Sequence, residues 1–270
     1  MRNGFYVIDA HCHVYPDKIA VRAVAGTAGF YGVAENDFDG TVSTLLRLKQ
    51  EAGVDHCLVQ SVATSPRQVR SINEFIARTE REGGGVFTGL GTLHPDSEDQ
   101  RADVRHLVEL GLHGVKLHPD IQGFPLDGEK SLEICALCEE FGLPLLLHTG
   151  DRRYDYSNPN RLIPVLERFP RLTVIGAHLG GWSMWHEASA QLKGRENLFF
   201  DCSSTFWWIG AQAAKEIIRD LGADRVLFGT DYPMWEPKTE LDTFFTMDLT
   251  EEENRMILSE NAKRVFKLKI

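Results

Sequence analysis

Cysteine is scarce in this chain of 270 residues, which has only five, an odd number spread along its length. Such usage fits reduced thiols better than a disulfide framework. The sequence also has no apolar run of about 18 residues, the length that a membrane span needs, and no signal-peptide pattern precedes the first apolar stretch. A cytoplasmic protein without membrane contact is therefore expected.

Positive charge is scarce as well. The chain has 29 lysines and arginines against 39 aspartates and glutamates, which gives a formal net charge of -10. This balance argues against the basic surface that nucleic acids and anionic membranes require. The hydrophobic content of 43% is ordinary for a globular protein with a sizeable core. A small molecule is the expected partner, and a homodimer stays open.

The chain has no proline- or serine-rich linker, so residues 1–270 are expected to form one domain. Short, nearly continuous apolar runs predict parallel strands buried on both faces, at residues 5–9, 57–62, 86–93, 114–117, 145–148, 173–177, 198–201 and 226–229. Helix patterns lie between and after them, at residues 42–52, 67–82, 99–110, 132–140, 159–168, 184–193, 211–221 and 241–248. Strands that alternate with helices in this way predict an α/β fold, a single-domain (β/α)8 TIM barrel.

Two segments fall outside this alternation. Residues 14–40 contain four glycines and are interpreted as a mobile loop that could act as a lid. A last helix is predicted at residues 251–267, because Thr250 and Glu253 have the spacing of a capping box. This helix should pack against the exterior or the base of the barrel.

The first predicted strand leads into two histidines, His11 and His13, one residue apart. Side chains alternate along a strand, so both imidazoles should face one side while Cys12 faces the helices on the other. Neutral imidazole is a common ligand of zinc and similar ions. The pair alone is a weak signal, and its meaning depends on partners elsewhere in the chain.

Further polar residues stand where later strands are predicted to end, which in a barrel is the end that carries active sites. Lys116 and His118 stand at the end of the fourth strand, His148 at the end of the fifth, His178 at the end of the sixth and Asp231 at the end of the eighth. Burying several ionisable groups together costs several kcal/mol unless a cation or another group compensates them. A metal site at the carboxyl ends of the strands would remove that cost.

The ordered set of strand-end residues resembles the amidohydrolase superfamily of metal-dependent TIM-barrel enzymes. The local sequences look most like its amidohydrolase-related branch, which also contains non-oxidative decarboxylases. The resemblance extends over the whole chain, and it is carried by His11, His13, Lys116, His148, His178 and Asp231.

The resemblance implies roles for these residues. His11, His13, His148 and Asp231 would hold one divalent ion, zinc or a similar metal. The ion would lower the pKa of a bound water, and Asp231 would take the proton of that water. His178 would lie beside the water, where it orients the water or polarises the substrate.

Lys116 has two alternative roles. In two-metal members of the superfamily a carboxylated lysine at this place bridges both ions, whereas an unmodified Lys116 could bind a substrate carboxylate. His118 is a further candidate of the same kind. Arg153 and Tyr154 follow the fifth strand on a loop at the barrel mouth, where the guanidinium group could clamp a carboxylate, although a solvated basic loop is an equal alternative.

Two enzymatic functions follow from the resemblance. The first is a metal-dependent hydrolase of a small amide, cyclic amide, lactone or ester, and it is the function we expect. The alternative is a metal-dependent non-oxidative decarboxylase of a small unsaturated or aromatic acid, against which Lys116 counts because that branch typically lacks the lysine. A non-catalytic metal-binding protein is the third reading, and the paired acid–base groups Asp231 and His178 argue against it.

Overall fold

Parallel strands form the centre of the structure, a computed structural model that describes residues 1–33 and 38–270. The strands are β1 (Ile8–His13), β2 (His56–Gln60), β3 (Phe87–Gly89), β4 (Gly91–Thr92), β5 (Val115–Leu117), β6 (Leu145–Leu147), β7 (Val174–Gly176), β8 (Leu198–Asp201) and β9 (Val226–Leu227). Strands β1 to β3 pair in order, and so do β4 to β9, all in parallel.

β3 and β4 are two halves of one barrel strand. Leu90 lies between them and donates its backbone N–H to the carbonyl oxygen of Val59 at 2.9 Å, on the β2 side. The next residue, Gly91, donates to the carbonyl oxygen of Gly114 at 2.9 Å, on the β5 side. The two sheets are therefore continuous through this joint.

The barrel closes where the end of the chain's last strand meets β1. Ala10 donates its backbone N–H to the carbonyl oxygen of Phe228 at 2.9 Å. The buried carboxylate of Asp9 accepts from the backbone N–H of Thr230 at 3.0 Å and from its hydroxyl at 2.6 Å. The predicted (β/α)8 TIM barrel is confirmed.

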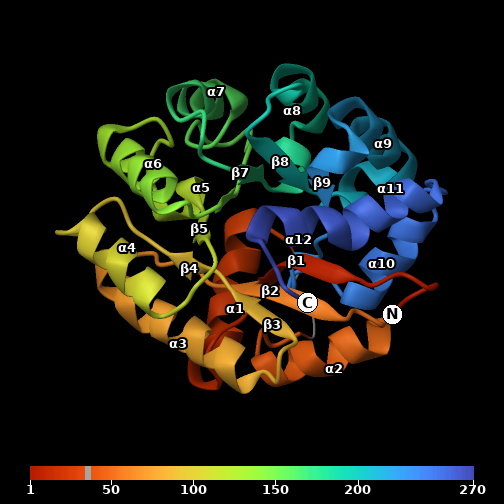
Figure 1. Cartoon of the computed structure of the whole chain (residues 1–270), viewed down its shortest axis with the longest axis horizontal. Helices are drawn as coiled ribbons and strands as arrows, with labels where there is room; N and C mark the ends of the chain where they lie inside the picture. The colour runs from red at the N-terminus through yellow and green to blue at the C-terminus, as the bar shows by residue number, and fades with distance from the viewer. Residues whose placement is uncertain (34–37) are drawn as a thin grey trace.

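Helices cover the outside of the barrel (Figure 1). They are α2 (Val42–Ala52), α3 (Val69–Glu82), α4 (Gln100–Glu109), α6 (Glu129–Phe141), α7 (Pro159–Arg168), α8 (Trp185–Leu192), α9 (Phe206–Leu221) and α10 (Pro237–Phe245). Their number and order agree with the sequence pattern, and the short α5 (Pro119–Gln122) is an addition to it. Apolar residues pack between helices and strands, and Cys12 belongs to this layer as predicted.

The prediction of a loop over residues 14–40 is wrong for much of its length, because α1 (Asp17–Tyr31) occupies it. Gly26 and Gly29 suggested a loop. However, glycine inside a helix costs only about 1 kcal/mol relative to alanine, and alanines and other helix formers make up much of this segment.

Helix α1 has one buried face, formed by Ala20, Val24 and Ala28 at intervals of four residues. It ends at Gly32, whose positive φ of 66° is the left-handed conformation that commonly closes a helix. The rest of the predicted loop includes residues 34–37, which lie outside the described residues. A helix thus forms the wall where a mobile loop was expected.

The last helix is also built differently from the prediction. It consists of α11 (Glu251–Arg255), a π-helical turn, η4 (Met256–Glu260), and α12 (Asn261–Phe266). The capping box of Thr250 and Glu253 is present as predicted. The segment crosses the near end of the barrel in Figure 1.

Helix α12 closes the base of the barrel. Its apolar side chains join those that point into the barrel from the strands, in a cluster that includes Ile8, Leu58, Leu90, Leu146, Ile175, Leu227, Ala262, Val265 and Phe266. The barrel is therefore filled with apolar side chains at this end.

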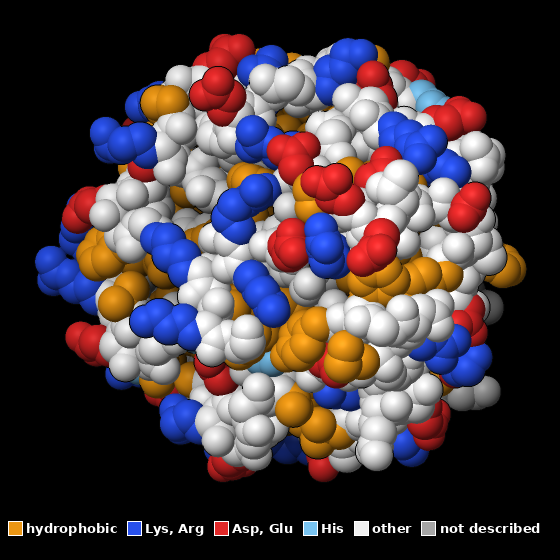
Figure 2. Space-filling view, turned by 45° about the vertical axis from the view of Figure 1, so that its right-hand side comes forward, with side chains coloured by type: hydrophobic (Ala, Val, Ile, Leu, Met, Phe, Trp, Pro, Cys, Tyr) orange, Lys and Arg blue, Asp and Glu red, His pale blue; other side chains and the backbone are white. Residues whose placement is uncertain are grey.

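The molecular surface is mixed in charge. Figure 2 shows acidic and basic side chains interspersed over one face, with hydrophobic side chains in small groups between them. None of the helices in the described part of the chain is long and apolar enough to cross a membrane.

Candidate active site

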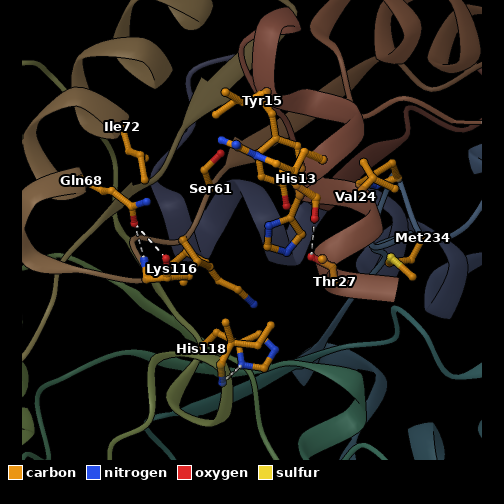
Figure 3. Close-up of a pocket in the computed structure, with 18 of the residues that line it drawn as sticks. His13, Tyr15, Val24, Thr27, Ser61, Gln68, Ile72, Lys116, His118 and Met234 are labelled. Carbon is orange, nitrogen blue, oxygen red and sulfur yellow. Dashed lines mark hydrogen bonds between the residues drawn. The ribbon is translucent and has the colours of Figure 1, made fainter. Parts of the chain in front are cut away.

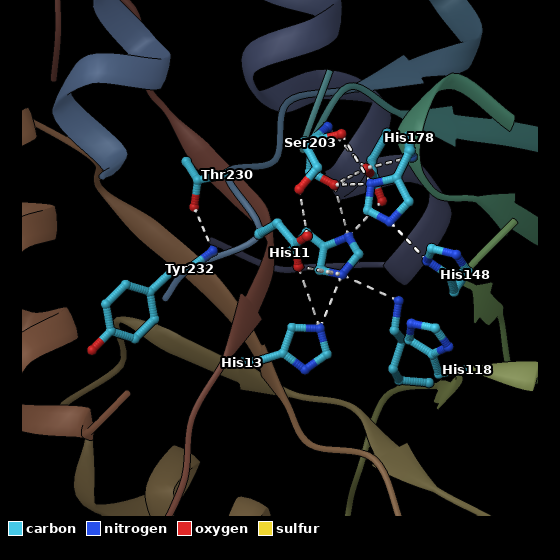
Figure 4. A network of polar contacts seen from close by, with 12 residues as sticks. His11, His13, His118, His148, His178, Ser203, Thr230 and Tyr232 are labelled. Atoms are coloured by element: carbon cyan, nitrogen blue, oxygen red, sulfur yellow. Dashed lines mark hydrogen bonds and ion pairs between the residues drawn. The ribbon is translucent and has the colours of Figure 1, made fainter. Parts of the chain in front are cut away.

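β1 brings two histidines to the mouth of the barrel because its pairing with β2 is irregular. The register shifts between Asp9 and Cys12, so the side-chain alternation changes at this point. Cys12 turns outward, while His11 and His13 lie close together on the inside (Figure 4). Their Nε2 atoms are 3.2 Å apart.

Asp231 completes a group with these two histidines. Its Oδ1 atom lies 3.3 Å from Nε2 of His11 and 3.5 Å from Nε2 of His13. Asp231 has a positive φ of 63°, and its backbone N–H donates to the carbonyl oxygen of His11 at 2.8 Å. The Ser204 hydroxyl donates to Oδ2 at 2.6 Å. Two imidazoles and one carboxylate thus converge within reach of one metal ion.

Asp201, at the end of β8, fixes the orientation of His11. Its carboxylate accepts a hydrogen bond from Nδ1 of His11 at 2.9 Å, so Nε2 carries the lone pair and faces His13 and Asp231. Burial alone would raise the pKa of Asp201, but His11 and other nearby donors hold it below the usual range. Asp201 was not predicted as a site residue, although its position at a strand end was a signal.

His178 and His148 face each other at 3.0 Å, from Nε2 to Nδ1. The other nitrogen of each ring lies against a carbonyl oxygen, Ser203 O for His178 at 2.9 Å and Gly150 O for His148 at 3.1 Å. A neutral imidazole has one N–H group, and in each ring this group donates to the carbonyl oxygen. The two nitrogens that face each other therefore carry lone pairs. Burial lowers the pKa of both rings, that of His178 to about 4, which disfavours a shared proton. Two facing lone pairs, on Nε2 of His178 and Nδ1 of His148, suit a metal ion as ligands.

His148 also belongs to a second polar group. Its ring stacks on that of His118, with centroids 3.9 Å apart, and its Nε2 lies 3.7 Å from Asp120. The Tyr31 hydroxyl contacts Nε2 of His118 at 2.6 Å and Nδ1 of His148 at 3.2 Å. The structure therefore does not place His148 with His11 in one group, and its role as a ligand of the same ion stays a prediction.

Asp120 and Tyr31 are functional candidates that the sequence analysis missed. Burial raises the pKa of Asp120 to about 6, and its Oδ1 has no hydrogen-bond partner among the described residues. Tyr31 was hidden because it ends α1, the segment read as a loop. Asp120 had a signal, since it follows His118 by two residues at a strand end.

Lys116 lies at the centre of the mouth and has no exposed surface. Its Nζ donates to Nε2 of His11 at 3.1 Å. Burial lowers its pKa to about 8. Both roles considered from the sequence, a bridge between ions and a ligand of the substrate, are open to a lysine at this place.

Arg153 and Tyr154 are not part of the polar centre. The Arg153 guanidinium binds the buried Asp151 at 2.7 Å and donates to the carbonyl oxygen of Phe30 at 2.6 Å. Tyr154 stacks on the ring of Phe30, with centroids 5.4 Å apart. These contacts hold the C-terminal end of α1 in place, so the expected carboxylate clamp has no support in the structure.

A cavity of about 740 Å³ connects the polar centre with solvent. His13, Lys116 and His118 line its inner end (Figure 3), and α1 and α3 form its walls. Such a volume is typical of small-molecule sites. The fold and the site together define a TIM barrel whose mouth carries a candidate metal site.

Comparison with known proteins identifies the family. Residues 8–268 match the family described as Amidohydrolase, so the chain belongs to the amidohydrolase family and is an enzyme of that superfamily. This agrees with the resemblance inferred from the strand-end residues.

Two sequence relatives indicate the direction of function, and a solved structure shares the fold. The chain is 28% identical to gamma-resorcylate decarboxylase of Polaromonas sp. strain JS666, over 90% of this chain and 94% of that protein. It is 25% identical to 2-amino-3-carboxymuconate-6-semialdehyde decarboxylase of Dictyostelium discoideum, over 60% of this chain but only 55% of that protein. A solved 5-carboxyvanillate decarboxylase of Novosphingobium aromaticivorans, complexed with manganese, has the same fold, with a TM-score of 0.77, 17% identity and coverage of 99% and 97%.

The expectation of a hydrolase is wrong. Both of the sequence relatives described above are named decarboxylases, which favours the alternative function. The presence of Lys116 was given too much weight against that alternative, because a lysine at this strand end is equally compatible with substrate binding.

Proposed function

We propose that the protein is a metal-dependent, non-oxidative decarboxylase of a small unsaturated or aromatic acid. The observation that carries the proposal is the similarity to gamma-resorcylate decarboxylase, which extends over 90% of this chain and 94% of that protein. The polar centre supports it, because it offers metal ligands, a buried cation and acid–base groups around one cavity.

One divalent ion would be held by His11, His13 and Asp231, with His148 as the fourth ligand. When bound, the ion would supply a Lewis acid for the anionic oxygens of the substrate. Imidazole and carboxylate donors accept zinc and manganese alike, so zinc, expected from the sequence, and manganese, present in the solved relative, are both candidates.

Decarboxylation breaks the bond between the carboxylate and the neighbouring carbon, leaves the electron pair on that carbon and releases carbon dioxide. The carbon then takes a proton that comes from solvent. Asp231 is the group proposed to deliver it, because its Oδ2 is held by the Ser204 hydroxyl at 2.6 Å and its side chain is 13% exposed. His178 would orient the substrate beside it.

Lys116 would remain an ammonium group and bind the substrate carboxylate in the one-metal enzyme. A carboxylated Lys116 that bridges a second ion is the alternative, and the number of ions per chain distinguishes the two. The homodimer and the cytoplasmic location expected from the sequence also stay predictions.

The proposal is tested with carboxyl-¹³C-labelled acids in D₂O. Manganese- or zinc-loaded protein is incubated with 2,6-dihydroxybenzoate and with a panel of other hydroxybenzoates and unsaturated acids. We expect ¹³CO₂ from at least one acid, together with one deuterium at the carbon that lost the carboxylate. Release of no labelled carbon dioxide from the whole panel would contradict the proposal, and chelated protein is the control.

A further inference from the structure

The cavity extends well beyond the polar centre. Its inner end lies at Lys116 and His118, and its outer end lies between α1 and α3. Along α3 the lining runs from Ser71 to Arg78, seven residues apart, which corresponds to a rise of about 10 Å. A single-ring acid bound at the metal centre would leave the outer part of this space empty.

The middle of the cavity is apolar. Ile19 and Ala23 face it from α1, four residues apart on one side of that helix, and Ile72 and Phe75 face it from α3. Figure 3 shows Ile72 at the opposite end of the view from His118. A ligand that fills this stretch needs an apolar segment.

The outer end is positively charged. Lys18 and Arg22 lie one turn apart on α1, and Arg78 lies opposite on α3 with its guanidinium 5.8 Å from the ring centroid of Phe75. None of these three cations forms an ion pair with another described residue. Asp231 is the one acidic residue among the described residues that line the cavity. In a chain of net charge -10, this is a local reversal of sign.

A neighbouring groove marks where the positive region ends. This groove of about 570 Å³ shares Lys18, Phe75 and Arg78 with the cavity, but it also contains the acidic Asp17 and Glu82. An anion is therefore favoured at the cations themselves and disfavoured farther out.

We propose that the substrate is an elongated dianion with one carboxylate at the metal centre, an apolar segment, and a second anionic group at Lys18, Arg22 and Arg78. This inference rests on the proposed function and adds the class of substrate. The second anion would set specificity and affinity, while the bond-breaking step takes place at the inner carboxylate.

The test compares ligands that differ only in the second anion. Binding to manganese-loaded protein is measured by calorimetry for 4-alkyl-2,6-dihydroxybenzoates with straight chains of two, four and six carbons, each ending in a methyl group or in a carboxylate. One exposed ion pair contributes little, but three cations together should give about tenfold tighter binding of the best carboxylate-ended ligand. Added salt should reduce this advantage.

Substitutions assign the effect to the three cations. Combined Lys18→Gln, Arg22→Gln and Arg78→Gln should remove the tenfold advantage and leave the affinity of the methyl-ended ligands unchanged. Arg81→Gln is the matched control, because Arg81 is also exposed on α3 but does not line the cavity. All four side chains are exposed, so the variants should fold, and Arg22→Gln alone should show part of the loss.

Equal affinities of methyl-ended and carboxylate-ended ligands, or an advantage that survives in the triple variant, would overturn the inference. That outcome is distinct from failure of the proposed function. The labelled-acid experiment could still show carbon dioxide release when the second anion has no effect, and the second anion could improve binding when no acid is decarboxylated.

Discussion

The two ends of the barrel differ in what they bury. At the base, α12 packs Ala262, Val265 and Phe266 against apolar strand residues such as Leu227. At the mouth, an almost equally buried set consists of histidines, carboxylates and Lys116.

The base therefore contributes mainly to the stability of the fold, and the mouth carries the groups for chemistry. Apolar burial at the base stabilises the fold by roughly 25 cal/mol per Å² removed from water. Buried ionisable groups at the mouth destabilise it unless partners or a cation compensate them. At the mouth, Asp201 compensates His11 through a hydrogen bond, and Asp120 lies 3.7 Å from His148. Substitutions at the mouth should therefore reduce metal binding and turnover, whereas substitutions at the base should reduce the free energy of unfolding.

The largest effect is expected from His11→Ala combined with His13→Ala. This variant loses two of the convergent donors, so the bound metal should fall from about one ion per chain to none, and turnover should be lost. Elemental analysis of the purified protein measures the loss. His186→Ala, at an exposed position on α8, is the control and should keep its metal. Full metal retention in the double variant would rule out the site as described.

Asp231→Asn should lower kcat by at least about a hundredfold and leave KM nearly unchanged. The amide keeps the shape and one coordinating oxygen but cannot deliver a proton, and acid–base groups typically contribute about 10²- to 10⁴-fold. Steady-state kinetics together with metal analysis test this. Near-normal turnover of a metal-loaded variant would transfer the proton-delivery role to His178.

Asp201→Asn should weaken metal binding by about 10- to 100-fold, because the partner that fixes the His11 ring is altered. Competition with a chromogenic chelator measures the affinity. Saturating metal should restore much of the turnover, since Asp201 acts through His11. If the affinity for the ion stays the same, the orientation of His11 does not depend on this carboxylate.

At the base, Phe266→Ala should have the smallest effect on chemistry. Phe266 is 3% exposed in the apolar cluster, so its truncation should cost about 3 to 5 kcal/mol of unfolding free energy. Metal content and kcat per folded molecule should stay close to those of the unsubstituted protein. Denaturant unfolding and kinetics of the same samples check both parts. A loss of turnover as large as that of Asp231→Asn would mean that the two ends are not independent.

The sequence predicted the barrel and much of the polar centre because both depend on local patterns. Apolar runs mark buried strands, and parallel strands bring their carboxyl ends together, so His11, His13 and Asp231 could be expected to meet. Helix α1 was not predicted because the glycines of this segment were taken to indicate a loop, although its alanines favour a helix.

Other features depend on contacts that no local pattern contains. Asp201 contacts a histidine 190 residues away in sequence, and the Tyr31 contact with His148 spans 117 residues. The strand-end residues also could not decide between hydrolysis and decarboxylation, because both reactions use the same types of metal ligand on the same fold. They differ in which bond of the substrate lies next to the metal and where the proton goes.

The central claim is that decarboxylation depends on an ion held at the mouth of the barrel. Its most direct test is a titration of chelated protein with Mn²⁺, in which bound metal is measured by electron paramagnetic resonance and carbon dioxide release by the labelled-acid assay in the same samples. We predict that release rises in proportion to bound metal and saturates near one ion per chain. Release from metal-free protein, or full metal binding without release from any acid of the panel, would contradict the account.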